Sequence, residues 1–202
     1  MPKCPLLIGI DLGTSAVKVG LFDADGRPVA LAREPYPLGT PRPGWAQQMP
    51  ADWWAATCSA LRWALARVDA ARVAAIGLAS QAPGQVLVDV GGAPLGPALI
   101  WQDRRASAEV AWLAERVTHA QAQAWTGLSS LADSALPPAR LLWLATHRHD
   151  DWARCAAILQ PKDYLHLRLT GEIATDVHSG FGLLLDPACG LYTSRSARPA
   201  RG

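Results

Sequence analysis

Five residues near the start of the chain have the types and spacing of a phosphate site: Asp11, Gly13, Thr14, Ser15 and Lys18. The three residues from Gly13 to Ser15 form a small-residue turn, in which backbone N–H groups and two hydroxyls can bind phosphate oxygens. The Asp11 carboxylate beside this turn suits a hydrated Mg²⁺, because magnesium in proteins keeps several of its waters. An ordinary β-hairpin with an exposed aspartate is the alternative interpretation of the same stretch.

A second group with chemical potential is Trp101, Asp103 and Arg105. A tryptophan at a strand tip can stack on the apolar face of a sugar, and carboxylates accept hydrogen bonds from sugar hydroxyls. In the alternative interpretation, Trp101 is a core residue, Asp103 caps the helix that follows, and the neighbouring arginines lie on the surface.

Short strands must position the first of these groups. An apolar run at 6–10 predicts a buried strand that carries Asp11 at its tip. Alternating apolar residues over 17–21 predict a return strand. A turn signal at 24–26 and a third apolar stretch at 27–33 complete an antiparallel meander of three strands.

A helix is predicted to begin at Pro50, after a loop rich in proline and glycine. Its buried stripe is expected at Trp54, Cys58, Leu61, Leu65 and Val68, with Trp53 and Trp63 covering the edges. The continuous apolar run at 73–79 predicts a buried parallel strand. Further strands are expected at 85–90, 98–101 and 156–159, and further helices from Asp103 to 117, from Pro137 and from Pro161 to Thr170.

This order of elements is typical of an α/β domain with a mixed sheet and flanking helices. The 202 residues suffice for one large domain, and the net charge of +2 gives no reason to expect a nucleic acid or membrane partner. The four cysteines form no paired metal motif, and no secretory signal or membrane-spanning run is present, so a reduced, cytoplasmic location is expected.

The stretch from Asp11 to Lys18 resembles the first phosphate loop of the actin, Hsp70 and sugar-kinase ATPase superfamily. It is similar above all to the FGGY carbohydrate kinases, and within them to the xylulokinase-like branch. Residues 44–50, 101–105 and 161–176 resemble further stretches of that family in the same order. The resemblance implies a ribonuclease H-like domain that uses ATP and Mg²⁺ to phosphorylate a sugar or polyol hydroxyl.

The resemblance also implies roles for particular residues. Asp11 would hold Mg²⁺ through water, while Gly13, Thr14, Ser15 and Lys18 would bind the phosphates. The substrate side would consist of Gln81, Ala82, Pro83, Trp101, Asp103 and Arg105, with a structural role as the alternative for Arg105. Ala82 and Pro83 stand where xylulokinases carry a Met-His pair that contacts the ketose. Because proline has no N–H and no side-chain donor, a hydrogen bond to the substrate is lost, and a related sugar or polyol, or a weakened site, is as admissible as D-xylulose.

On this basis, residues 1–190 are expected to form the FGGY N-terminal domain, followed by an unstructured tail at 191–202 that a shifted reading frame would explain. The C-terminal domain of the family, which carries the general base, would then be absent and the chain inactive alone. An exposed cleft face would favour self-association. Two alternatives stay open: a non-catalytic lobe that binds sugar or a partner, and an ATPase of the actin or Hsp70 type.

Overall fold

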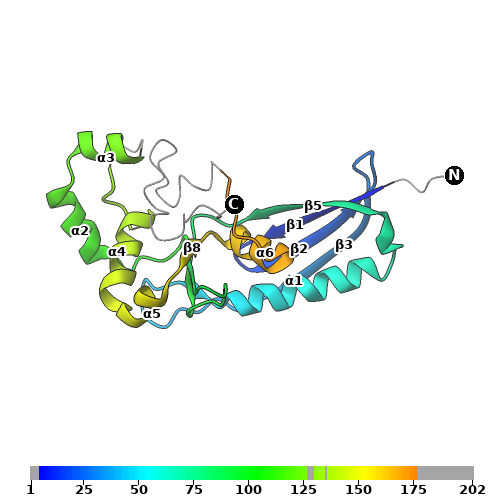
Figure 1. Ribbon diagram of the computed structural model, residues 1–202, viewed down its shortest axis with the longest axis horizontal. Helices are drawn as coiled ribbons and strands as arrows, with labels where there is room; N and C mark the ends of the chain where they lie inside the picture. Colours follow the sequence, from blue (N-terminus) through cyan, green and yellow to red (C-terminus); the bar gives the residue numbers. More distant parts are fainter. Residues whose placement is uncertain (1–4, 127–129, 135, 177–202) are drawn as a thin grey trace, which may run out of the picture.

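The computed structural model describes residues 5–126, 130–134 and 136–176, which form an elongated molecule with a sheet at one end and helices at the other (Figure 1). The strands are β1 (Leu6–Leu12), β2 (Ala16–Phe22), β3 (Pro28–Pro35), β4 (Gln47–Gln48), β5 (Val73–Ser80), β6 (Val86–Val88), β7 (Ala98–Leu99) and β8 (Ala157–Leu159). The helices are α1 (Pro50–Leu65), the 3₁₀ turn η1 (Ala70–Arg72), α2 (Ser107–Arg116), α3 (His119–Thr126), α4 (Pro137–His147), α5 (His149–Arg154) and α6 (Pro161–Thr170).

The main sheet has the strand order β3-β2-β1-β5. β1 runs antiparallel to β2 and parallel to β5, so the sheet is mixed, and the predicted meander and parallel strand are confirmed. The register pairs Asp11 with Lys18 and with Ala79. The carboxyl ends of β1 and β5 therefore meet at one edge of the sheet, where the predicted phosphate turn begins.

Helix α1 covers one face of this sheet, but with a different stripe from the one predicted. Its buried residues are Pro50, Trp53, Ala56, Thr57, Ala60 and Ala64, and the side chain of Trp53 is fully buried. The expected stripe is only partly buried, and the prediction that Trp53 covers an edge was wrong. Both stripes have helical spacing, and the sheet takes the one with small residues because alanines let the helix approach closely.

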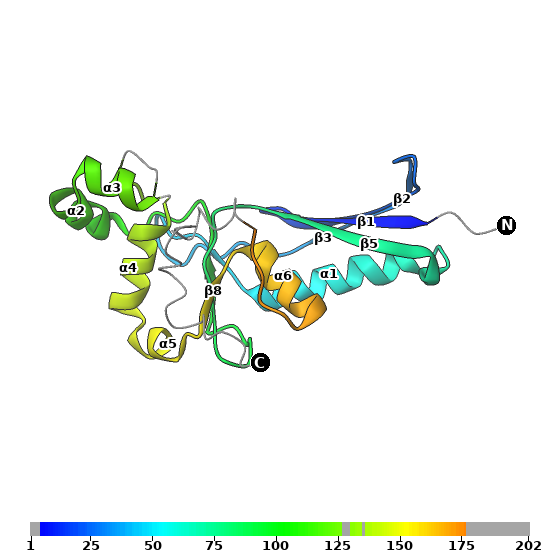
Figure 2. The same cartoon turned by 45° about the horizontal axis from the view of Figure 1, so that its top comes forward.

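Strand β5 is parallel to β1 as predicted, yet it is not buried, and Ile76 at its centre keeps 45% of its surface exposed. β5 is an edge strand, so Ile76 stays exposed although it shares a face with the buried Ile8. Because α1 and α6 lie on the same side of the sheet, the other face of β5 is open as well (Figure 2). In the part of the chain that the structure describes, no helix covers the opposite face. That open face carries exposed apolar side chains, including Leu7, Val29 and Leu31.

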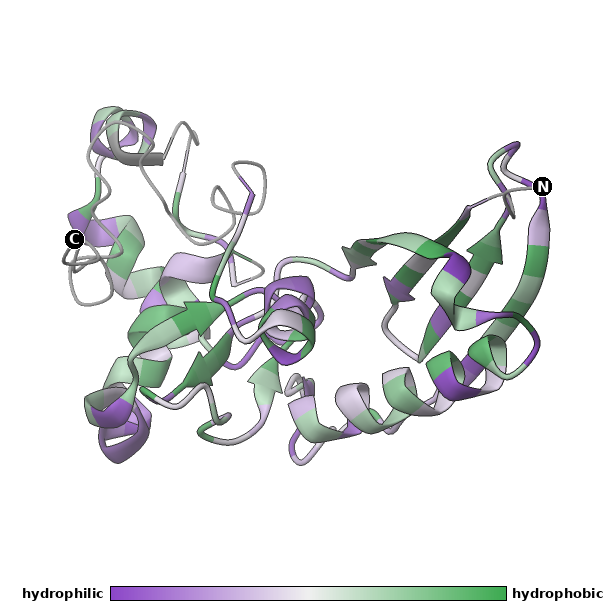
Figure 3. Cartoon of the chain, turned by 45° about the vertical axis from the view of Figure 1, so that its right-hand side comes forward, coloured by the Kyte–Doolittle hydropathy of each residue, from purple (hydrophilic) through white to green (hydrophobic). Residues whose placement is uncertain are grey.

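A second hydrophobic cluster lies in the other half of the molecule. It joins α2, α3 and α4 to β6 and β7 through residues such as Leu87, Leu99, Leu113 and Leu144. Figure 3 shows hydrophobic residues on the strands of both halves, which suits sheets packed against helices. Within the described ranges, no helix combines the length and the hydrophobicity needed to cross a membrane.

The start of α6 packs directly on Gly84, whose N–H donates to Oε1 of Gln160 at 2.8 Å. A Cβ atom on Gly84 would lie 2.8 Å from Cγ of Pro161, closer than real Cβ contacts come. We expect Gly84→Ala to lower the free energy of unfolding by about 1–3 kcal/mol through overpacking, as measured by chemical denaturation. Gly77→Ala is the matched control, because its nearest atom would be 3.9 Å away. Equal stability of the two variants would contradict this packing.

Candidate phosphate and sugar site

The tip of β1 presents a carboxylate and an ammonium group side by side. Oδ2 of Asp11 lies 3.1 Å from Nζ of Lys18, and the two side chains are 49% and 62% exposed. An ion pair this exposed contributes little to stability, so both groups can exchange this contact for one with a ligand. Both line a largely apolar hollow of about 670 Å³ on the open face of the sheet.

The turn between β1 and β2 is fixed by hydrogen bonds that its carbonyl oxygens accept from other segments. The Tyr36 hydroxyl donates to the oxygen of Gly13, Nε2 of Gln48 donates to that of Thr14 at 2.8 Å, and the Tyr36 N–H donates to that of Ser15 at 3.4 Å. The backbone N–H groups of Thr14 and Ser15, by contrast, donate to no acceptor among the described residues. Two free amide donors in one short turn are the ingredients of an anion site.

Gln81 is brought to this turn from the end of β5. Its backbone N–H donates to the oxygen of Leu12 at 2.8 Å, and its Nε2 donates to Oε1 of Gln48 at 2.7 Å. Ala82 next to it is exposed and Pro83 is half-buried. These two residues offer a ligand only apolar side-chain surface, so polar recognition at this tip depends on Gln81 and on backbone carbonyls.

Trp101 also reaches the turn, from a segment far along the chain. Its indole N–H donates to Oγ1 of Thr14 at 3.0 Å, while 39% of its surface stays exposed. The alternative that Trp101 is a core residue is therefore wrong. A partly exposed indole ring anchored beside a turn with free amide donors suits a bound sugar ring.

Asp103 and Arg105, which follow Trp101 in the sequence, are buried, with side-chain exposures of 0% and 3%. Oδ2 of Asp103 accepts the N–H of Ala46 at 2.7 Å, and both carboxylate oxygens accept from Nε of Arg105 at 2.9 and 3.0 Å. Asp103 does not cap the next helix, since α2 begins only at Ser107 and has no side-chain cap. The geometry gives this pair a structural role, which was the alternative considered for Arg105.

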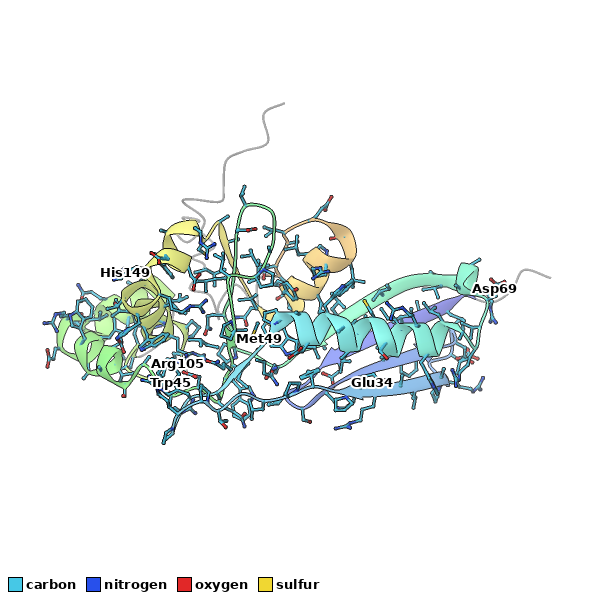
Figure 4. All side chains as sticks on the ribbon, turned by 90° about the horizontal axis from the view of Figure 1, so that it is seen from below. Glu34, Trp45, Met49, Asp69, Arg105 and His149 are labelled. Atoms are coloured by element: carbon cyan, nitrogen blue, oxygen red, sulfur yellow. The ribbon has the colours of Figure 1, made fainter. Side chains whose placement is uncertain are left out.

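The Asp103–Arg105 pair belongs to a buried cluster that includes Trp45. The Arg105 guanidinium lies 3.9 Å from the centre of the Trp45 ring (Figure 4) and donates to Oε1 of Gln47 at 2.9 Å. The Arg104 N–H donates to the oxygen of Gly44 at 2.7 Å. The stretches 44–50 and 101–105, which resemble separate family motifs, thus form one structural unit that carries Trp101.

Two residues of the site were missed from the sequence: Tyr36 and Gln48. Gln48 lies inside the stretch at 44–50 that resembles the family, but the resemblance assigns it no role. Tyr36 stands in a loop with no motif around it, and only its contacts with the oxygens of Gly13 and Ser15 reveal it.

The fold and this site define a class: an α/β lobe that presents free backbone amides, a carboxylate and a solvent-exposed aromatic around one turn. The sequence pattern of the FGGY family of carbohydrate kinases, N-terminal domain, matches residues 6–180. The chain therefore belongs to the FGGY family of carbohydrate kinases, whose N-terminal domain has the ribonuclease H-like fold of the actin-like ATPases.

Individual relatives agree with this assignment. The chain is 37% identical over 179 residues to the xylulose kinase of Escherichia coli (strain K12), covering 89% of this chain and 36% of that protein. It is 39% identical over 141 residues to a glycerol kinase of Polaromonas naphthalenivorans, covering 68% and 28%. The crystal structure of xylulose kinase from Rhodospirillum rubrum matches with a TM-score of 0.83 at 30% identity, covering 92% and 38%. The chain spans little more than a third of the length of the xylulose kinases that it matches.

Burial, and secondarily the charge of Asp11, raises the pKa of Tyr36 well above its ordinary value of 10.0. The stability that the neutral phenol contributes is complete below about pH 10 and is lost as the pH rises from there toward the folded-state pKa. We expect folded wild type and Tyr36→Phe to give the same phenolate absorbance around pH 10. An additional phenolate in folded wild type at that pH would contradict the burial of this hydroxyl.

Proposed function

We propose that this chain is the N-terminal lobe of an ATP-dependent carbohydrate kinase, xylulokinase-like, that phosphorylates a hydroxyl of a sugar or polyol. The observation that carries the proposal is the bond between Thr14 and Trp101. It places a turn with free amide donors directly against an exposed aromatic ring. Phosphoryl transfer needs this kind of adjacency, because its catalysis rests on positioning and on neutralising charge.

The residues of the turn fit ATP and Mg²⁺. The free N–H groups of Thr14 and Ser15 and the ammonium of Lys18 are donors for phosphate oxygens. The half-exposed Asp11 carboxylate suits Mg²⁺ held through water, since one protein carboxylate together with phosphate oxygens is a usual ligand set for this ion. When bound, Mg²⁺–ATP supplies the γ-phosphoryl group and the charge that offsets its negative oxygens.

The substrate side fits a small polyhydroxylated molecule. Trp101 offers a ring face, and Gln81 is the polar side chain at the neighbouring strand tip. Relatives with the names xylulose kinase and glycerol kinase are similar at comparable identity, which supports a sugar or polyol as the substrate class. Ala82 and Pro83 offer no side-chain hydrogen bond that would select one sugar, so D-xylulose and related sugars and polyols are all candidates to test.

We further propose that this chain alone has little or no kinase turnover. The residues that bond the turn and the Trp101 tip, which are Tyr36, Gln48 and Gln81, include no carboxylate that could take the hydroxyl proton. Asp11 faces Lys18, and Asp103 is buried against Arg105. The same observation favours the second candidate function, a non-catalytic lobe that binds a sugar or a partner. Membership of a carbohydrate kinase family argues against an ATPase of the actin or Hsp70 type.

The Asp11 assignment can be tested by titration calorimetry of this chain. We expect ATP to bind more tightly with Mg²⁺ than without, and Asp11→Asn to reduce the magnesium dependence by about tenfold, as is usual when a ligand of the metal's water shell is lost. Asp25→Asn is the matched control, because this carboxylate pairs with Arg27 in the β2–β3 turn. An unchanged magnesium dependence in Asp11→Asn would refute the assignment. ATP turnover with a pentulose, lost in Asp11→Asn, would refute the proposed inactivity.

We also propose self-association through the open face of the sheet, in addition to the cleft face expected from the sequence. Leu31 on this face is 61% exposed, and large exposed apolar patches promote association. We expect light scattering of wild type at high concentration to show oligomers, and Leu31→Glu to be monomeric. Val90→Glu, at a 96% exposed position outside this face, should behave as wild type. A wild-type monomer at high concentration would speak against this proposal.

A further inference from the structure

Gln48 occupies the centre of the site without being part of any ligand surface. Its side chain is 2% exposed and uses both ends. Nε2 donates to the oxygen of Thr14 at 2.8 Å and toward that of Pro37 at 3.4 Å. Oε1 accepts the indole N–H of Trp53 at 3.1 Å and Nε2 of Gln81 at 2.7 Å. Two donors and two acceptor sites are the whole capacity of a glutamine amide, so this amide is saturated.

These bonds join the two halves of the site. Thr14 belongs to the phosphate turn and Gln81 to the substrate tip, and the amide of Gln48 lies between them. Thr14 in turn bonds Trp101 through its hydroxyl. One buried side chain therefore bonds both Gln81 and Thr14, and Thr14 also bonds Trp101.

The neighbouring Gln47 bonds Arg105 instead of the turn. Residues that follow one another in a strand point to opposite faces, and Gln47 and Gln48 form β4. Oε1 of Gln47 accepts from the Arg105 guanidinium at 2.9 Å, beside the buried carboxylate of Asp103. Two adjacent glutamines of the same size thus serve different partners, and only Gln48 touches the phosphate turn.

We propose that Gln48 is a positioning residue that couples the phosphate turn to the substrate tip, so that a ligand on one side strengthens binding on the other. A second observation supports a responsive Gln81. Its Oε1 is buried and has no hydrogen-bond donor among the described residues. A ligand hydroxyl that reached this oxygen would satisfy it and fix the Gln81 side chain, and with it the bond to Gln48.

The variant Gln48→Glu tests the connection selectively. A carboxylate still accepts from Trp53 and Gln81, but toward Thr14 it offers an oxygen to a carbonyl oxygen, which repels it. Gln47→Glu is the matched control, because the same change there keeps an acceptor for Arg105 and adds a favourable charge. The two variants differ from wild type by the same atoms at adjacent positions.

The readout is the indole N–H resonance of Trp101 in a ¹⁵N-labelled sample without ligands, assigned with Trp101→Phe. We expect it to shift and to exchange faster with water in Gln48→Glu, although Gln48 does not touch Trp101. In Gln47→Glu it should stay at the wild-type position. An unmoved Trp101 resonance in folded Gln48→Glu would overturn the proposal. Gln48→Met, which removes all bonds without a charge, should move the resonance as well. If both Gln48 variants fail to fold while Gln47→Glu folds, Gln48 serves stability and the coupling role is refuted.

The ligand half of the proposal rests on the proposed kinase function. In wild type we expect Mg²⁺–ADP to raise the affinity for D-xylulose at least about fivefold, the lower end of usual coupling between sites. In Gln48→Glu the affinities with and without nucleotide should be equal. A coupling that survives in this variant would contradict the role of Gln48. If wild type binds neither ligand, the proposed function fails for this chain, and the Trp101 resonance still decides whether Gln48 connects the two segments.

Discussion

The hydrogen bonds that fix the carbonyl oxygens of Gly13, Thr14 and Ser15 are the constraint on which the site depends. A turn between two strands must satisfy its polar backbone groups, and here donors from outside the turn bind all three oxygens. The amide N–H groups of Thr14 and Ser15 are then the donors left for a ligand. The proposed anion site thus depends on how Tyr36 and Gln48 hold the carbonyl side of the turn.

One face of the sheet is packed against α1 in the core, and the opposite face carries candidate site residues. Trp53 and the alanines of α1 bury one face, which gives the strands a rigid support. The opposite face holds the hollow lined by Asp11 and Lys18, and the exposed edge strand β5 borders it. A strand end on a rigid sheet positions a carboxylate more accurately than a free loop does, which suits a reaction that depends on positioning.

The sequence predicts what is decided locally and misses what is decided by contact between distant segments. The strands on either side of the turn at Gly13–Ser15 follow from periodicity and were confirmed. The burial of Trp53 was missed because the helix packs through the stripe that Trp53 shares with Ala56, Ala60 and Ala64, and not through the predicted stripe. The burial of Asp103 depends on the distant N–H of Ala46, and the role of Gln48 on partners more than thirty positions away. Contacts between residues this far apart cannot be predicted from the spacing of residues in the sequence.

The most direct test of this account is an amide spectrum of ¹⁵N-labelled protein, recorded while Mg²⁺–ADP is added. The account predicts that the N–H resonances of Thr14 and Ser15 move more than any others, because these are the free donors of the turn. It also predicts that Trp101 follows through its bond to Thr14. If the nucleotide leaves the resonances of Thr14 and Ser15 in place, the turn is not a phosphate site and the central claim is wrong.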